Sequence, residues 1–224
     1  MSPMRSIQGA VRRQRTAADS FRQPLADWTG DARVFVPQGY EPGYDYPLLV
    51  WRTDPATRFD LGRVMARVSL RNYVAVEPAA SETAMWRAID RVRDRLSIHP
   101  RRIWLVGHAA GGTAAFRTAC QHPDTFAGAI SLGGWFPLGE PVLGQLDAIR
   151  RMPLLFCCRA AAVEADPDRT DRTLRLFHAA GGTLAMRIYQ QGTMLSRATL
   201  ADVNRWLMDE LCGASSPLQP HEAA

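Results

Sequence analysis

The chain has 224 residues, of which 46% are hydrophobic and 22% are charged, and its formal net charge at neutral pH is +5. This length suits one globular domain that buries most of its apolar surface. No apolar stretch approaches the roughly 20 residues that a membrane-spanning helix needs, and the arginine-rich N-terminus lacks the apolar segment of a signal peptide. We therefore expect no membrane span and a cytoplasmic location.

The basic residues do not form a nucleic-acid-binding pattern. All 27 of them are arginine, and they are scattered along the chain and often stand next to acids. In residues 86–96, "WRAIDRVRDRL", arginines alternate with aspartates at spacings that pair along one helix face. A basic stripe with interleaved aromatics is absent, so we expect a solvated helix face and no nucleic-acid partner.

The two ends of the chain differ in composition from its middle. Residues 1–24 are polar and arginine-rich, and we expect them to form a flexible N-terminal arm. Residues 213–224, "GASSPLQPHEAA", are typical of a disordered tail. Residues 25–212 form the predicted domain.

Within this domain, short apolar runs alternate with segments of helical period. The predicted strands are 32–37, 47–51, 73–77, 102–107, 128–133, 153–158 and 184–189. Their continuous apolar character is typical of a parallel sheet that is covered on both faces. Two predicted helices show apolar residues along one face: these are Met85, Ala88, Ile89, Val92 and Leu96 in one, and Leu200, Val203, Leu207 and Leu211 in the other.

Capping residues agree with this alternation. Asp166 followed by Pro167 predicts the start of a helix, and Gly181-Gly182 and Gly213 stand where helices should end. We predict an α/β fold with a doubly wound, mostly parallel sheet and helices on both faces.

The four cysteines show no disulfide framework. Cys157 and Cys158 are neighbours in a predicted strand, where their side chains point to opposite faces and are poorly placed to form a bridge. Reduced, packed thiols are expected, as in a cytosolic protein.

One long segment resembles a known family. Residues 102–137, "RIWLVGHAAGGTAAFRTACQHPDTFAGAISLGGWFP", resemble the core of α/β-hydrolases of the phospholipase/carboxylesterase (acyl-protein thioesterase-like) type. In that family a strand leads into G-x-S-x-G-G, and the following helix ends at His-Pro. The resemblance extends from about residue 33 to 211 and implies the α/β-hydrolase fold.

The catalytic positions that this resemblance implies hold residues without the required chemistry. The serine nucleophile corresponds to Ala109, whose methyl group cannot form an acyl-enzyme. The histidine base corresponds to Thr193, and the orienting acid corresponds to about Ala160. The family's His-Gly oxyanion loop corresponds to "WRTDPA", in which Pro55 has no N–H to donate. The other oxyanion donor, the backbone of Ala110, is retained.

Two further features accompany these losses. Only "PAAS" (78–81) separates the predicted strand at 73–77 from the next helix, where active relatives have a longer excursion. The five histidines do not supply the missing base, and His108, inside the glycine motif, is interpreted as a packed or partly exposed residue. If the cleft binds a ligand, the predicted contacts are His108, Trp51 and Arg52.

Three functions remain open. The leading hypothesis is a hydrolase-like pseudoenzyme that serves as a binding, scaffolding or regulatory module, with a small molecule in the old cleft or a protein as its partner. The second is an active esterase or thioesterase with relocated catalytic residues, for which Ser131, Cys157 and Cys158 are the candidate nucleophiles. The third is an assembly subunit that docks through residues 1–24, and a homo-oligomer is compatible with each.

No cofactor or metal is expected. The sequence has no cluster of ligands at metal spacing, and "GHAAGG" lacks the full dinucleotide-binding fingerprint.

Overall fold

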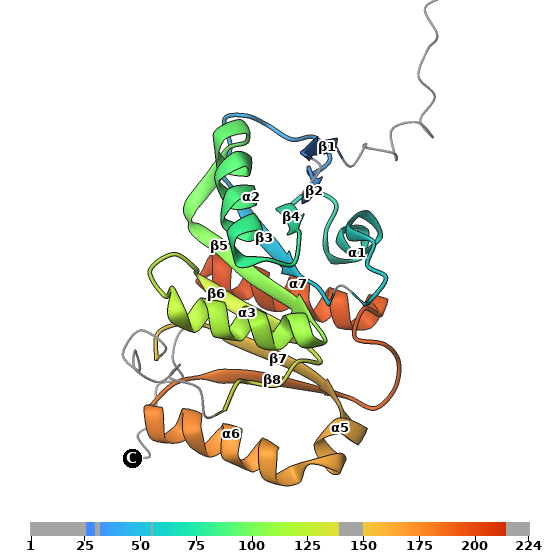
Figure 1. The fold of residues 1–224 in the computed structure, drawn as a ribbon, viewed down its shortest axis with the longest axis vertical. Coiled ribbons are helices and arrows are strands. Elements are labelled where there is room, and N and C mark those ends of the chain that lie inside the picture. The colour runs from blue at the N-terminus through green and yellow to red at the C-terminus, as the bar shows by residue number, and fades with distance from the viewer. Residues whose placement is uncertain (1–25, 30–31, 55, 139–149, 214–224) are drawn as a thin grey trace, which may run out of the picture.

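A single eight-stranded sheet forms the centre of the molecule (Figure 1). The structure is a computed structural model that describes residues 26–29, 32–54, 56–138 and 150–213. Its strands are β1 (Ala26–Thr29), β2 (Ala32–Phe35), β3 (Tyr46–Arg52), β4 (Val74–Pro78), β5 (Ile98–His108), β6 (Gly128–Leu132), β7 (Leu154–Arg159) and β8 (Leu184–Tyr189). Its helices are α1 (Leu61–Val68), α2 (Glu82–Arg95), α3 (Ala110–Gln121), α5 (Ala160–Ala165), α6 (Pro167–Ala180) and α7 (Arg197–Cys212).

The strands lie in the order β1-β2-β4-β3-β5-β6-β7-β8. From β4 to β8 along this order each neighbouring pair is parallel, whereas β1 pairs antiparallel with β2, and β2 with β4. The predicted fold class, an α/β protein with a mostly parallel sheet, is confirmed. The carboxyl ends of β3, β4, β5, β6, β7 and β8 therefore lie along one side of the sheet, with the predicted site residues His108, Ala109 and Ala160 at or directly after them.

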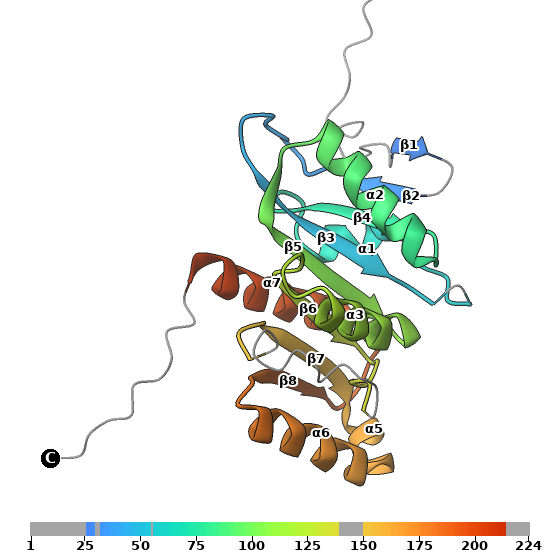
Figure 2. The same cartoon turned by 60° about the vertical axis from the view of Figure 1, so that its left-hand side comes forward.

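Helices cover both faces of this sheet (Figures 1 and 2). On one face, Leu48 and Val50 of β3 join a core cluster with residues of α2, α3 and α6. On the other, Leu49 and Trp51 join a second cluster with α1 and α7. This alternation follows from the two-residue period of a strand, and it explains why a strand between two helical layers must be apolar at every position.

Each of the seven predicted strands is present in the sheet. The residues of β1, α1 and α5 were not identified from the sequence. The strand β1 has four residues and pairs at an edge with β2, so its apolar period is too short to be distinctive.

The expected caps are also present. The side chain of Asp166 accepts a hydrogen bond from the backbone N–H of Arg169 at 3.0 Å, and Pro167 is the first residue of α6. Gly181 and Gly213 end α6 and α7 in the left-handed conformation, with φ of 65° and 71°. Glycine adopts this conformation without the steric cost of a Cβ atom.

The cysteines and the charged helix face lie as expected. Cys157 belongs to the core cluster on the α1 and α7 face and Cys158 to the cluster on the opposite face, and all four cysteines are free. The alternating charges of α2 are solvent-exposed: Arg87, Asp90, Arg91, Asp94 and Arg95.

The arm at 1–24 lies outside the described residues, as does the tail at 213–224 apart from Gly213. None of the helices in the described part of the chain is long and apolar enough to cross a membrane.

The central position of β5 gives a test of this core. Leu105 is fully buried on β5, so Leu105→Ala should lower the free energy of unfolding by about 2–5 kcal/mol, measured by urea denaturation. The matched control is Leu174→Ala on α6, where the side chain is 46% exposed, and its effect should stay within about 0.5 kcal/mol. Equal losses in the two variants would contradict the assigned core.

Candidate functional site

The turn between β5 and α3 is the sharp elbow that the glycine motif predicts. Ala109 connects the two elements with φ 52° and ψ −125°, and it is the one non-glycine residue with positive φ in the described part of the chain. Its N–H donates to the carbonyl oxygen of Leu132 at 3.0 Å, and its carbonyl oxygen accepts from the N–H of Gly112 at 2.9 Å. A non-glycine residue in this region costs roughly 1–3 kcal/mol and persists only where its surroundings enforce it.

The glycines around Ala109 are required by close backbone contacts. A Cβ atom on Gly107 would lie 2.1 Å from the carbonyl oxygen of Gly111, and one on Gly111 would lie 2.1 Å from that of Arg52. A Cβ on Gly134 would lie 2.3 Å from the carbonyl oxygen of Ala109. The elbow is therefore packed directly against the backbone at the end of β3 and after β6, and this packing holds the strained turn in place.

The loops that follow the neighbouring strands converge on this elbow. Leu132, the acceptor for Ala109, ends β6, and the N–H of the next residue, Gly133, donates to the carbonyl oxygen of Cys157 in β7 at 2.8 Å. A Cβ on Gly133 would lie 3.4 Å from the Cγ of Met194, in the loop after β8. The ends of β5, β6, β7 and β8 are thus brought together, as the resemblance implies.

Residues at the three positions that the resemblance assigns to the triad carry no nucleophilic, basic or acidic side chain. Ala109 carries only a methyl group. Ala160 is the buried first residue of α5, directly after β7, and Thr193 is exposed in the loop after β8. An exposed threonine hydroxyl cannot accept a proton at neutral pH.

The oxyanion positions are only partly described. Ala110 is the first residue of α3, and the first four N–H groups of an α-helix have no partner within the helix. Pro55 lies outside the described residues. The preceding residue, Asp54, makes two local hydrogen bonds. Its side chain accepts one from the N–H of Ala56 at 2.9 Å, and its carbonyl oxygen accepts one from the N–H of Thr57 at 2.8 Å.

His108 is the titratable residue nearest the elbow in the chain. Its side chain is half-buried, and its Nδ1 is buried without a hydrogen-bond partner in the described structure. Burial lowers the pKa of His108 below its usual 6.5, and the nearby carboxylate of Asp54 opposes that shift. The imidazole is therefore neutral at pH 7.

The other two predicted ligand contacts lie on opposite faces of β3. Trp51 is fully buried and packs against Phe59 with ring centroids 5.2 Å apart, so it presents no surface to a ligand in this structure. Arg52 is half-buried, and its guanidinium donates to the Sδ of Met85 at 3.3 Å and to the carbonyl oxygen of Ala80 at 3.4 Å. Burial lowers the pKa of Arg52, against the raising effect of Glu82.

A buried carboxylate at the end of β4 was missed in the sequence. Glu77 is 6% exposed, and its Oε1 accepts from the guanidinium of Arg33 at 2.8 Å and from the hydroxyl of Thr53 at 3.2 Å. Its Oε2 is buried without a partner in the described structure. Burial raises the pKa of Glu77 although Arg33 acts to lower it. The signal was the single acid that ends the apolar run "YVAVE" (73–77).

The candidate relocated nucleophiles are all enclosed. Ser131 is fully buried, and its hydroxyl donates to the carbonyl oxygen of Gly134 at 2.5 Å and accepts from the N–H of the same residue at 3.1 Å. Burial raises the pKa of the Cys157 thiol to about 12 and that of Cys158 to about 11. A thiol with such a pKa carries very little of the nucleophilic thiolate at neutral pH.

Because the backbone at Ala109 is strained, we expect a glycine substitution there to stabilise the protein. Ala109→Gly should raise the free energy of unfolding by about 1 kcal/mol, because the relief of strain exceeds the extra chain entropy that glycine has when unfolded. Ala114→Gly, inside α3, is the matched control and should lower it by about 1 kcal/mol. Urea denaturation measures both, and destabilisation by Ala109→Gly would contradict the elbow conformation.

The lowered pKa of His108 gives a pH prediction. Because the pKa of His108 is lower in the folded protein, the unfolded chain binds a proton there more readily once the pH falls below about 6.5. The folded state therefore loses stability as the pH falls through this range, and His108 causes no loss above it. Urea midpoints between about pH 7.5 and 5.5 should fall less in His108→Gln than in the parent. His178→Gln, at an exposed histidine of α6, is the matched control. The raised pKa of Glu77 makes the folded state more stable on acidification. This effect is the same in the parent and in both variants, so it does not contribute to the difference between their slopes. An unchanged slope in His108→Gln would contradict the assignment.

Comparisons with known proteins agree with this geometry. No protein-family model matches the chain. It is 28% identical over 151 aligned residues to the proposed esterase NocK of Nocardia uniformis subsp. tsuyamanensis. The alignment covers 56% of this chain and 44% of the relative. The chain thus spans less than half the length of that relative.

Solved structures share the fold at low sequence identity. A thermostable esterase matches with a TM-score of 0.60 and 18% identity, over 80% of this chain and 58% of its own. The S-formylglutathione hydrolase FrmB of Staphylococcus aureus matches with a TM-score of 0.61 and 12% identity, over 80% of this chain and 89% of its own. The resemblance indicated by the sequence is confirmed at this level: the chain has the α/β-hydrolase fold, and the proteins that it resembles are esterases and serine hydrolases.

Proposed function

We propose that this protein is an α/β-hydrolase-fold pseudoenzyme that serves as a binding, scaffolding or regulatory module. The observation that carries the proposal is an alanine at the one strained non-glycine position of the described chain, on a turn whose glycines are all retained. In the esterase reaction this turn presents a serine oxygen to the ester carbonyl. Ala109 keeps the turn without the group that the turn presents.

The neighbouring positions support the same conclusion. A serine hydroxyl becomes a useful nucleophile when a base removes its proton and an acid orients that base. Thr193 and Ala160 supply neither function. Loss of one oxyanion donor typically costs a further ~2.7–4 kcal/mol of transition-state stabilisation. These losses are chemically independent and all act on one reaction.

An active esterase with relocated residues is the second candidate. It would need a nucleophile that reaches both the solvent and a base. The burial of Ser131, Cys157 and Cys158 and the raised pKa of both thiols disfavour it. The third candidate, an assembly subunit, would use residues 1–24, which lie outside the described residues.

The proposed partner is a small molecule in the former cleft or another protein, and a homo-oligomer is compatible with both. We place the protein in the cytoplasm on the sequence arguments alone. The polar groups nearest the elbow that could contact a ligand are His108 and the first N–H groups of α3, which favour a hydrogen-bonding or anionic group.

Restoring the nucleophile alone should not produce an esterase. Turnover of 4-nitrophenyl acetate by Ala109→Ser should stay within about threefold of the parent, because triad members act as a unit. Activity should begin with Ala109→Ser combined with Thr193→His, and it should rise further when Ala160→Asp and Pro55→Gly are added. Ala114→Ser with Thr193→His is the matched control, since its hydroxyl lies inside α3.

Labelling with a fluorophosphonate gives a second measurement of the same series. Two outcomes would contradict the proposal. Turnover by the parent that survives Cys157→Ala and Cys158→Ala would mean that the active site lies elsewhere. Strong activity of Ala109→Ser alone would mean that a base, with His108 as the first candidate, is already in place.

A further inference from the structure

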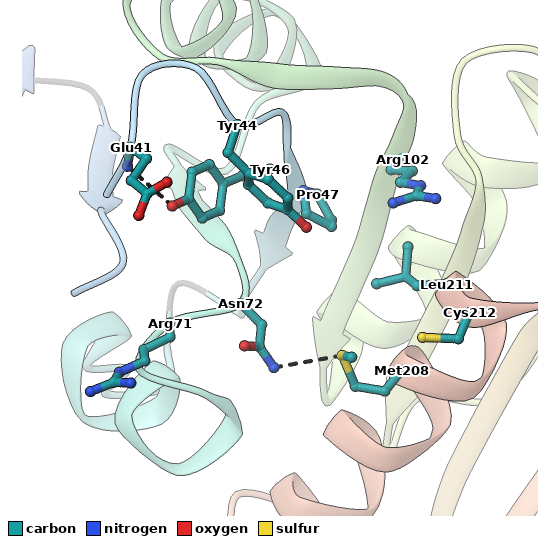
Figure 3. Close-up of a pocket in the computed structure, with 10 residues that line it drawn as sticks. All are labelled: Glu41, Tyr44, Tyr46, Pro47, Arg71, Asn72, Arg102, Met208, Leu211 and Cys212. Atoms are coloured by element: carbon teal, nitrogen blue, oxygen red, sulfur yellow. Dashed lines mark hydrogen bonds between the residues drawn. The ribbon is translucent and has the colours of Figure 1, made fainter. Parts of the chain in front are cut away.

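A cavity of about 340 Å³ opens at the amino ends of the strands, away from the elbow (Figure 3). Tyr46 is the first residue of β3, Asn72 precedes β4, and Arg102 lies in the first half of β5. The last turns of α7 close the cavity from below with Met208 and Cys212. Seven strand positions separate Arg102 from Ala109, which corresponds to about 23 Å. The cavity is therefore distinct from the former catalytic cleft.

One wall of the cavity is a rigid aromatic cluster. The ring of Tyr46 stacks on Tyr40 with centroids 5.2 Å apart and meets the edge of Tyr44 at 4.7 Å. The hydroxyl of Tyr46 accepts from the N–H of Glu41 at 3.1 Å, and that of Tyr40 accepts from the N–H of Ser97 at 2.7 Å. These contacts fix the rings before any ligand arrives, which lowers the entropic cost of binding.

The opposite wall is also held in place. The amide of Asn72 donates to the Sδ of Met208 at 3.5 Å, and the hydroxyl of Tyr73 donates to the Oδ1 of Asn204 at 3.0 Å. These bonds connect α7 to the residues directly before β4. A methionine thioether and tyrosine rings are both favourable neighbours for an aromatic group.

The cavity carries unpaired positive charge. Within the described residues, the guanidinium groups of Arg71 and Arg102 make no salt bridge or hydrogen bond. Glu41 is the one acidic residue that lines the cavity, and it is exposed. Arg102 is half-buried, and Figure 3 shows it above Leu211 and Cys212 on the side of the cavity formed by β5. A planar guanidinium that is partly removed from water favours a carboxylate, which it can bind with two hydrogen bonds.

An exposed aromatic side chain marks the mouth of the cavity. Tyr44 is 53% exposed and is one of three large hydrophobic side chains exposed in the described structure. The other two, on α6 and β8, do not line this cavity. An exposed aromatic beside an unpaired cation is typical of a binding site for a ligand that is apolar at one end and charged at the other.

We propose that this cavity binds a small aromatic carboxylate. The carboxylate pairs with Arg102, and Arg71 adds positive charge at the rim. The aromatic ring lies between the tyrosine wall and Met208. This site goes beyond the proposed function of the former cleft and does not depend on it.

Benzoate binding tests the proposal, by titration calorimetry and by protection of Cys212 from iodoacetamide. Cys212 is the one exposed cysteine, and the other three are buried, so alkylation reports on this cavity. Benzoate should bind saturably and slow the alkylation, whereas benzamide and cyclohexanecarboxylate should bind at least about tenfold more weakly, because each lacks one of the two recognised groups.

Arg102→Gln should weaken benzoate binding by about tenfold or more. Arg101→Gln is the matched control: it removes the same charge from the preceding residue, which is exposed and lines a different cavity, and it should leave the affinity unchanged. Tyr44→Ala should weaken benzoate binding and lower the thermal unfolding midpoint by no more than about 4 °C, because its side chain is 53% exposed.

Three results would overturn the proposal. They are the absence of saturable benzoate binding, an equal loss in Arg101→Gln and Arg102→Gln, and unchanged Cys212 alkylation at saturating benzoate. A loss of benzoate binding on Ala109→Ser, at the elbow, would place the ligand in the former cleft instead. Esterase activity in the Ala109→Ser series would refute the proposed function without bearing on this site.

Discussion

The backbone packing of the β5–α3 elbow is the constraint on which the site depends. Main-chain atoms of Gly107 and Gly111 approach each other, and those of Gly111 approach the end of β3, at distances that exclude any Cβ atom. The same contacts leave Ala109 with a positive φ. Because these contacts are made by the backbone, they do not depend on which side chain Ala109 presents. The turn can therefore persist whatever side chain stands at position 109, and a glycine motif alone is a sign of the fold and not of the reaction.

Buried polar side chains surround the elbow. Ser131 is fully buried and binds both polar atoms of the Gly134 backbone, which holds the loop after β6 against the start of α3. His108 and the buried Glu77 lie at the carboxyl ends of β5 and β4, which flank β3, and burial shifts the pKa of each so that the neutral form is favoured. Burial of this kind is common at functional sites.

The fold and the elbow could be predicted from the sequence because both leave a local pattern in it. Continuous apolar runs identified seven strands, and glycines at positions 107 and 111 identified the turn. Trp51 and Arg52 were grouped as ligand contacts, and the structure places their side chains on opposite faces of β3, as for any neighbours in a strand. The tyrosine cavity left no such pattern, and Glu77 left only a single acid at the end of the apolar run 73–77. Their contacts join residues far apart in the chain, such as Arg33 with Glu77 and Asn72 with Met208, and depend on register and helix placement that a single sequence does not specify.

The helix α7 links the two ends of the molecule. Its first turn follows Thr193 and Met194 beside the elbow, and its last turn lines the tyrosine cavity. Sixteen helical residues span about 24 Å, close to the roughly 23 Å of β5 between Arg102 and Ala109. Near the middle of this span Trp206 packs edge-on against Trp104 of β5, with centroids 5.6 Å apart. Large buried side chains thus pack α7 against β5 between the two sites. The elbow and the tyrosine cavity therefore lie at opposite ends of the same two elements.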